Sequence, residues 1–228
     1  MAADSIARLA AEVVSCRRCP RLVEWREAAA ANPPARFGHE RYWARPLPGF
    51  GDENARVLVI GLAPAAHGGN RTGRLFTGDR SGDFLFASLH RTGFANRATS
   101  VAVDDGLTLR GLYIAAIVRC APPDNKPTPE ERTSCLPYLV REVRLLPEVR
   151  AVVALGSFAW DGALRALREL GYRPAARPAF GHMAEARVGP LALLGSYHPS
   201  QQNTFTGRLT APMLDAAMLR ARQLADLE

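Results

Sequence analysis

Four short runs of consecutive apolar residues recur along the chain and determine its predicted architecture. A continuous apolar run is typical of a strand that is buried on both faces, as in a parallel sheet. The runs are Arg56–Leu62, Leu112–Val118, Ala151–Leu155 and Pro190–Leu194.

Segments with apolar residues at helical spacing surround and separate these runs. Helices are predicted at residues 3–15, 21–31, 83–91, 128–146, 158–170 and 209–226. Thr128, followed by Pro129 and Glu131, is a typical helix start. Strands that alternate with helices predict an α/β fold, in the form of a three-layer α/β/α sandwich. No repeat or linker divides the 228 residues, so a single domain, 1–228, is expected.

The charge of the chain favours an anionic partner, but only weakly. Lys and Arg number 29 against 22 Asp and Glu, and arginine greatly outnumbers lysine. The guanidinium group suits phosphate oxygens, which makes nucleic acid a natural partner, although an arginine-rich genome would explain many of these residues equally well. No apolar stretch is long enough to span a membrane, and the N-terminal residues do not fit a signal peptide. We therefore expect a cytoplasmic protein.

The four cysteines fall in two pairs. Cys16 and Cys19 form a C-x2-C pair before Pro20, and Cys120 and Cys135 flank a proline-rich segment. Two such pairs can complete a four-thiolate metal site, whereas disulfides would need an oxidising compartment. Zinc and an iron–sulfur cluster both accept four thiolates, so both stay open. Neighbouring cations favour the negatively charged cluster, and these are Arg17, Arg18, Arg21 and Arg119.

The loop after the first apolar run, residues 61–79, is a candidate for ligand binding. Ligands of parallel α/β sheets bind beyond the carboxyl ends of the strands, and the glycines of this loop let backbone amides approach a ligand closely. The loop matches neither a Walker A motif nor a dinucleotide fingerprint. Asp79 can cap the following helix or orient water, and both roles need a carboxylate. Phe76 either stacks on a planar base or packs in the core.

The loop after the fourth run, residues 197–204, is the second candidate. His198 follows a buried strand, so it is placed at the rim of the crevice, where it can donate a hydrogen bond to a ring carbonyl oxygen. Polar residues follow it, and Ser200, Asn203 and Arg208 are expected to contact a phosphate backbone.

Three segments carry a family resemblance: GLAPAAHGGNRTGRLFTGD, YIAAIVRCAPPDNKPTPEE and YHPSQQNTFTGRLT. With the C-x2-C-P start, they resemble the family 5, or B-type, iron–sulfur uracil-DNA glycosylases over nearly the whole chain. The resemblance implies a central four-stranded parallel sheet and a [4Fe-4S] cluster, with zinc as the alternative, on Cys16, Cys19, Cys120 and Cys135. It further implies a monomeric, nucleoid-associated glycosylase that flips uracil out of DNA and hydrolyses its N-glycosidic bond, which initiates base excision repair.

Two differences from the related A-type, family 4 enzymes affect the expected chemistry. No acid follows Gly61, so water activation falls to Asp79. The chain has Ala115 and Ala116 where the A-type enzymes carry an asparagine that reads uracil. A small apolar wall discriminates poorly between rings, so hypoxanthine and xanthine are expected substrates beside uracil.

The resemblance assigns a role to each candidate residue. Asp79 serves the water and the developing sugar cation, while His198 binds the base oxygen. Phe76 stacks under the base, and the rest of the base pocket is Gly61, Leu62, Ala63, Pro64, Ala65, Asn70 and Ala116. Contacts to DNA come from Arg71, Ser200, Gln201, Gln202, Asn203, Thr204 and Arg208, with residues 200–204 filling the gap in the minor groove.

Two other functions compete with this assignment. A non-catalytic lesion-binding module with iron–sulfur or zinc would explain the cysteines but would need no acid in FTGD. An enzyme acting on free nucleosides or nucleotides would explain the glycine-rich loop but not the basic excess. Little salt dependence of DNA binding would favour the second of these.

Overall fold

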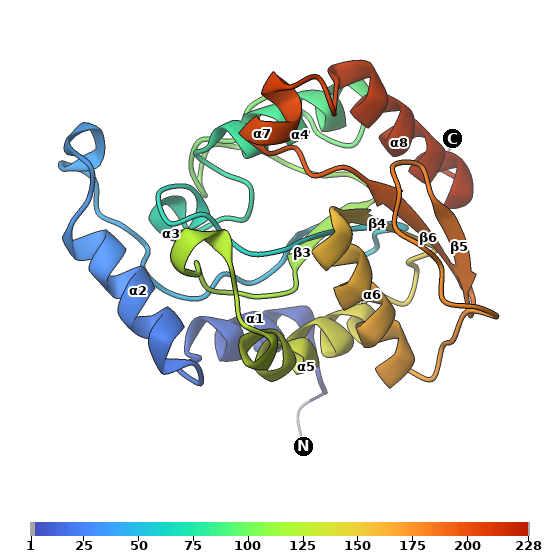
Figure 1. Cartoon of the computed structure of the whole chain (residues 1–228), viewed down its shortest axis with the longest axis horizontal. Helices are drawn as coiled ribbons and strands as arrows, with labels where there is room; N and C mark the ends of the chain where they lie inside the picture. The colour runs from blue at the N-terminus through green and yellow to red at the C-terminus, as the bar shows by residue number, and fades with distance from the viewer. Residues whose placement is uncertain (1–2, 228) are drawn as a thin grey trace.

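A six-stranded sheet forms the centre of the structure, a computed structural model that describes residues 3–227 (Figure 1). The strands lie in the order β1-β3-β2-β4-β6-β5. The four inner strands are parallel and are β2 (Val57–Gly61), β3 (Leu112–Ala116), β4 (Ala151–Leu155) and β6 (Leu191–Ser196). They coincide with the four apolar runs, which confirms the predicted parallel sheet.

Two short antiparallel strands extend the sheet beyond the four that the sequence predicts. β1 (Phe50–Gly51) pairs with β3, and β5 (Glu185–Val188) pairs with β6. β1 has only two residues, and most of β5 is not buried, so neither has a buried apolar run. The expected four-stranded parallel sheet is therefore the central part of a six-stranded sheet with antiparallel edge strands.

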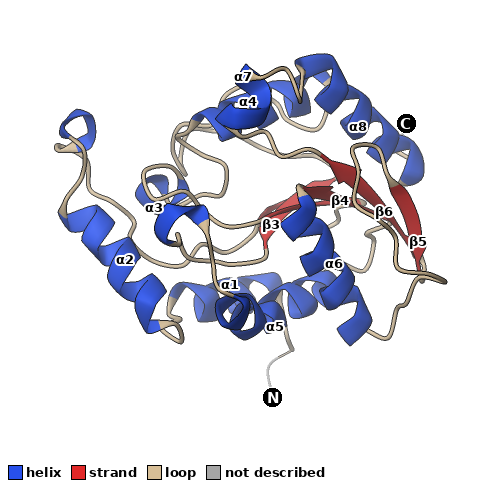
Figure 2. Ribbon diagram, viewed as in Figure 1, coloured by secondary structure: helices blue, strands red, loops and turns tan. Residues whose placement is uncertain are grey.

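Alternate residues of β2 point into two separate cores. Leu58 and Ile60 belong to one buried cluster, and Val57 and Val59 belong to the other. Because strand side chains alternate between faces, the continuous apolar run serves both cores at once. Helices cover both faces, as Figure 2 shows, which confirms the three-layer sandwich. They are α5 (Pro129–Leu145) and α6 (Ser157–Glu169) on one face, and α4 (Arg80–Arg91) and α8 (Ala211–Leu224) on the other.

The N-terminal helices lie outside the sandwich. α1 (Ile6–Val14) packs on α5 through Leu9, Val13 and Tyr138. α2 (Pro20–Ala31) begins directly after Cys19 and extends past the sheet on the left of Figure 1. A 3₁₀ turn at Ala35–Phe37 follows it.

Helix boundaries depend on capping groups more than on apolar spacing. α4 begins three residues before the predicted start because Asp79 caps it. Thr128 and Glu131 form the reciprocal capping box predicted for α5. The one-turn helices α3 (Gly69–Thr72) and α7 (Gln201–Phe205) were not predicted, since one turn is too short to show a helical period. No helix in the part of the chain that the structure describes is long and apolar enough to cross a membrane.

Candidate active site

Asp79 lies between the start of α4 and the glycine-rich loop. Its Oδ1 atom accepts a hydrogen bond of 2.9 Å from the amide of Gly82. A Cβ atom at Gly68 would collide with the Asp79 carboxylate, so only glycine lets the backbone approach the acid here. Both interpretations of Asp79 are compatible, because it caps α4 and also borders a cavity.

Burial raises the pKa of the Asp79 carboxyl group, and hydrogen bonds from the amides of Gly82 and Ser81 oppose that rise. Asp83 raises this pKa further, whereas Arg71 lowers it. A carboxylate with a raised pKa holds a proton more readily than an ordinary aspartate. Asp79 is therefore suited to orienting water and accepting its proton, which is the chemistry of a general base.

The cavity beside Asp79 has a volume of about 940 Å³. The glycine-rich loop, α2, the turn at residues 36–37, the loop at 122–125 and α7 all contribute to its wall. Its aromatic and cationic lining residues are Trp25, Phe37, Phe205, Arg36, His67, Arg71 and Arg80. Aromatic faces and guanidinium groups together suit planar bases and phosphates.

The rings of His198 and Phe76 lie next to each other. Their ring centroids are 6.0 Å apart and the rings are tilted by 32°. A Cβ atom on Gly61 would lie 2.6 Å from Cζ of Phe76, so the ring rests on the bare backbone of Gly61. Burial lowers the pKa of His198 to about 4, so the imidazole is neutral near pH 7 and can donate one hydrogen bond.

The strand register brings Gly61 beside Ala116 on β3. Ala116 is buried in the core on the α4 face, and Phe76 packs against the same cluster. Phe76 therefore packs on this core, with its ring also facing His198, and its stacking on a planar base stays a prediction. Of the predicted pocket residues, Ala65 borders the 940 Å³ cavity, whereas Phe76 and His198 do not.

Asn70 and Arg71 are engaged within the protein. Asn70 is fully buried, and its Nδ2 atom donates to the carbonyl oxygens of Arg26 and Ala66. It does not border the cavity, so its expected place in the base pocket is corrected to a buried position behind the loop. Arg71 does border the cavity, but its guanidinium donates to His67 O, Gly78 O and Glu40. These bonds close the glycine-rich loop, which limits the expected contact of Arg71 with DNA.

The segment after His198 forms α7. The side-chain amide of Asn203 donates to the carbonyl oxygen of His198 at 2.8 Å, and Thr204 Oγ1 donates to that of Ser200 at 3.2 Å. These bonds fix the shape of the segment, whereas Gln201 and Gln202 are exposed. Arg208 lies over the ring of Tyr197 at 4.7 Å.

Phe205 is a site residue that the sequence interpretation missed. It ends α7, lines the cavity and leaves 68% of its surface exposed, while Arg80 lies 5.3 Å from its ring centre. An exposed aromatic ring on a cavity wall is available for stacking on a base. The sequence feature that could have identified Phe205 is its position directly after the polar HPSQQNT segment.

His67 was missed as well. It borders the cavity next to Gly68, and its Nδ1 atom lies 3.0 Å from the hydroxyl of Tyr42. Burial lowers its pKa, and the charges of Arg36 and Arg71 lower it further. The sequence feature that could have identified His67 is its position inside the glycine-rich loop.

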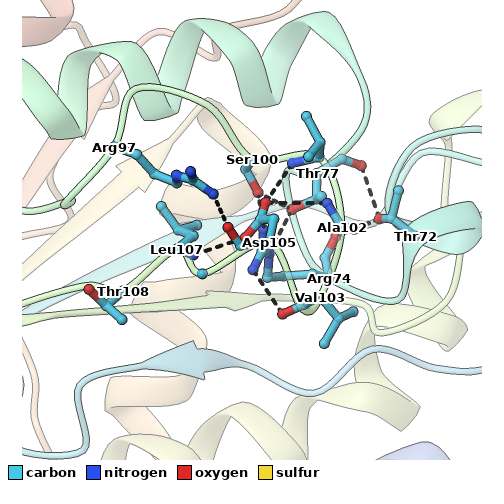
Figure 3. Close-up of polar contacts among 12 residues, drawn as sticks. Thr72, Arg74, Thr77, Arg97, Ser100, Ala102, Val103, Asp105, Leu107 and Thr108 are labelled. Carbon is cyan, nitrogen blue, oxygen red and sulfur yellow. Dashed lines mark hydrogen bonds and ion pairs between the residues drawn. The ribbon is translucent and has the colours of Figure 1, made fainter.

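A buried polar network supports the loop that carries Asp79 (Figure 3). Arg74 donates to Asp105 at 2.6 Å and to Ser100 Oγ at 2.7 Å, and Thr77 Oγ1 lies 2.6 Å from the same Ser100 oxygen. The amide of Gly78 donates to the carbonyl oxygen of Ser100. Segment 100–107 thus fixes the two residues that precede Asp79.

The four cysteines, which are far apart in sequence, border one small cavity. Burial raises the pKa of Cys120 to about 11 and that of Cys135 to about 12. The amide of Arg119 donates to Cys135 Sγ at 3.4 Å, and Arg26 Nη1 donates to Cys120 Sγ at 3.0 Å. Among residues 3–227, no group of three or more His, Cys, Asp and Glu is arranged to hold a single metal ion.

Fold and site together define a class: α/β/α proteins with a partly buried carboxylate near the end of a parallel sheet, bordering a cavity with aromatic and arginine walls. The model of the uracil DNA glycosylase superfamily matches residues 48–222. The chain is 53% identical to a type-5 uracil-DNA glycosylase of Mycobacterium bovis over 228 residues, which cover 99% of this chain and 84% of that protein. The chain belongs to the uracil-DNA glycosylase superfamily and, within it, to the type-5 family.

Two further relatives place the chain within the superfamily. A type-5 uracil-DNA glycosylase of Thermus thermophilus is 51% identical over 216 residues, covering 94% of this chain and 96% of that protein. A type-4 uracil-DNA glycosylase of Pyrobaculum aerophilum is 31% identical over 166 residues, covering 70% of this chain and 74% of that protein. The predicted resemblance to family 5 is confirmed.

Proposed function

We propose that this protein is a monofunctional DNA glycosylase that hydrolyses the N-glycosidic bond of uracil in DNA. The observation that carries the proposal is the Asp79 carboxylate, which is held at the start of α4 and borders a cavity walled by aromatic and arginine side chains. Its relatives of the type-5 family are named for this activity.

In the proposed mechanism, Asp79 orients a water molecule and stabilises the positive charge that develops on the sugar. The departing base gains negative charge, which hydrogen-bond donors can stabilise. The neutral imidazole of His198 is the proposed donor to the base oxygen, with the backbone amides of residues 61–65 beside it. A neutral donor is suitable here because it gives up no proton to the departing base.

The substrate range is proposed to extend to hypoxanthine and xanthine. Ala116, beside Gly61, offers a methyl group and no hydrogen-bonding amide at this position. A wall without polar groups imposes little penalty on a different ring, whereas a site built to pair with one base rejects others strongly. Excision of these deaminated bases would be the first step of base excision repair.

The contact with DNA is proposed to centre on α7 and the cavity rim. Ser200, Gln201 and Gln202 would follow the minor groove, and Phe205 would enter the stack when the damaged base is flipped out. Unstacking a base costs a few kcal/mol, roughly, and an aromatic side chain recovers part of that cost.

A [4Fe-4S] cluster on Cys16, Cys19, Cys120 and Cys135 is the proposed cofactor. The four thiols share one small cavity, and cationic Arg26 and the amide of Arg119 donate toward two of them. Four thiolates accept either an iron–sulfur cluster or zinc, and the cationic neighbour Arg26 favours the negatively charged cluster. When bound, the cluster would join α1, α2 and α5 without entering the hydrolysis.

Base release from short duplexes tests the proposal. Duplexes that contain uracil, hypoxanthine or xanthine opposite a defined base are incubated with the protein, and abasic sites are cleaved with alkali and counted. We expect release of all three bases, with uracil opposite guanine included. Binding without release would support a lesion-binding module instead, and strict selectivity for uracil would contradict the role given to Ala116.

A further inference from the structure

Helix α2 lies between the thiol site and the cavity. Its first residue follows Cys19 directly, and Trp25, with 38% of its surface exposed, lines the cavity. The short helix α2 therefore contacts both the thiol site and the cavity. A shift in the position of α2 would move one wall of the cavity.

Arg26, the next residue on α2, points at the thiols. Only 2% of its surface is exposed, and its Nη1 atom donates to Cys120 Sγ at 3.0 Å. Both terminal nitrogens lie 3.5 Å from the carbonyl oxygen of Cys16. The nearest carboxylate is Glu27 at 3.9 Å, and it bonds to Arg17 instead. A buried guanidinium without a close carboxylate needs another negative partner, and the four cysteines would supply it when they hold the proposed negatively charged cluster.

The backbone of the same residue holds the glycine-rich loop. The carbonyl oxygen of Arg26 accepts a hydrogen bond of 3.1 Å from Nδ2 of the fully buried Asn70. Asn70 in turn binds its own loop, because its backbone amide donates to Ala65 O at 3.1 Å. Its carbonyl oxygen accepts a hydrogen bond of 3.0 Å from the amide of Ala44, which precedes β1. Ala65 borders the cavity.

We propose that Arg26 and Asn70 form a mechanical link through which the thiol site positions the cavity wall. The link runs from Cys120 through the side chain and then the carbonyl group of Arg26 to the side chain of Asn70, and from there to residues 65–71. Neither residue touches substrate, so both are positioning residues. The proposal rests on the proposed function in one respect, namely that the thiols hold a negatively charged cluster.

Hydrogen exchange, followed by mass spectrometry on the protein as purified with its cluster, tests the link. Asn70→Ala breaks the link on the cavity side without touching a thiol. We expect unchanged visible absorption of the cluster, with amide exchange in residues 65–72 faster by about tenfold, since the hydrogen bonds from Asn70 Nδ2 to the carbonyl oxygens of Arg26 and Ala66 are both lost. Affinity for a duplex with a non-hydrolysable uridine analogue should fall, as measured by fluorescence anisotropy.

Arg26→Gln breaks the link on the thiol side. We expect the same faster exchange in residues 65–72 and, in addition, faster bleaching of the cluster absorption by an oxidant. Arg21→Gln is the matched control on the same helix, because Arg21 joins α2 to Glu131 of α5 and reaches neither Cys120 nor Asn70. It should leave exchange in residues 65–72 at the level of the unmodified protein.

Three results would overturn the link. These are unchanged exchange in residues 65–72 for Asn70→Ala, unchanged exchange there for Arg26→Gln, and an equal change for Arg21→Gln. Failure of the proposed function looks different. In that case the unmodified protein releases no uracil, while the exchange differences among the variants persist.

Discussion

The two carboxylate oxygens of Asp79 make different contacts. One oxygen caps α4, which anchors the carboxylate, and the other approaches the bare backbone at Gly68. Burial makes the ionised form costly, while the amides at the helix start lower that cost. This balance produces a carboxylate that is fixed in place and has a pKa above that of an exposed aspartate.

The raised pKa of Asp79 predicts an acid limb in the rate of base release. Because the ionised form is the active one, the rate should fall as the pH decreases through the raised pKa, which lies above the ordinary value of 3.8. His198, with a pKa of about 4, stays neutral over most of this range. Single-turnover rates of base release between pH 4 and 9 measure this decrease at low pH. A midpoint at the ordinary histidine value of 6.5 that vanished in His198→Ala would assign the limb to His198 instead.

At the scale of elements, the sequence predicts the strands and helices that show a regular apolar pattern, and it misses elements too short to show one. The parallel strands were predictable because continuous apolar runs have few other interpretations, and the helices because their apolar spacing spans several turns. β1 and α7 could not be predicted, since two residues or one turn show no period. The positions of His198 after β6 and of Asp79 before α4 could be predicted, whereas their chemical roles stay predictions. The burial of Asn70 could not be predicted, because it depends on α2, which is distant in sequence.

Phe205 at the end of α7 predicts a duplex-specific defect. Phe205→Ala should weaken base release from duplex DNA by about 1–3 kcal/mol, the scale of one aromatic stack on a base, and should affect single-stranded substrates much less. Single-turnover rates on both substrates give the comparison.

Phe158 provides a matched control for that variant. Its ring is also exposed, at 54%, and is also flanked by an arginine, with Arg132 at 5.2 Å, but it does not line the cavity. Phe158→Ala should therefore release uracil from both substrates at the normal rate. Equal defects in the two variants would show that Phe205 has no special place in the duplex.

At the scale of the whole molecule, the sheet positions the loops that carry the candidate site residues, and segments outside the sandwich form the rest of the cavity wall. Loops from β2 and β6 bring Asp79 and His198 to one edge, while α2 and the turn at residues 35–37 add the outer wall of the cavity. The thiol cavity lies between the start of α2 and α5, and Trp25 of the same helix lines the cavity beside Asp79.

The net charge of +7 predicts steep salt dependence of DNA binding. Each phosphate contact contributes roughly 0.9 to the slope of log affinity against log salt, so several contacts give a slope of several units. Anisotropy titrations of a uracil duplex across a salt series measure this slope. A slope near zero would favour an enzyme of free nucleosides or nucleotides.

The most direct test of the account is single-turnover uracil release by Asp79→Asn, beside DNA affinity measured on the same preparation. Asparagine also caps helices well, and it removes a buried charge, so the variant should fold and remain stable. We predict a loss of release of about 10²–10⁴-fold with near-normal binding, and a smaller loss, about tenfold, for His198→Ala. Near-normal turnover by Asp79→Asn would contradict the account, because the carboxylate would then not be the group that activates water.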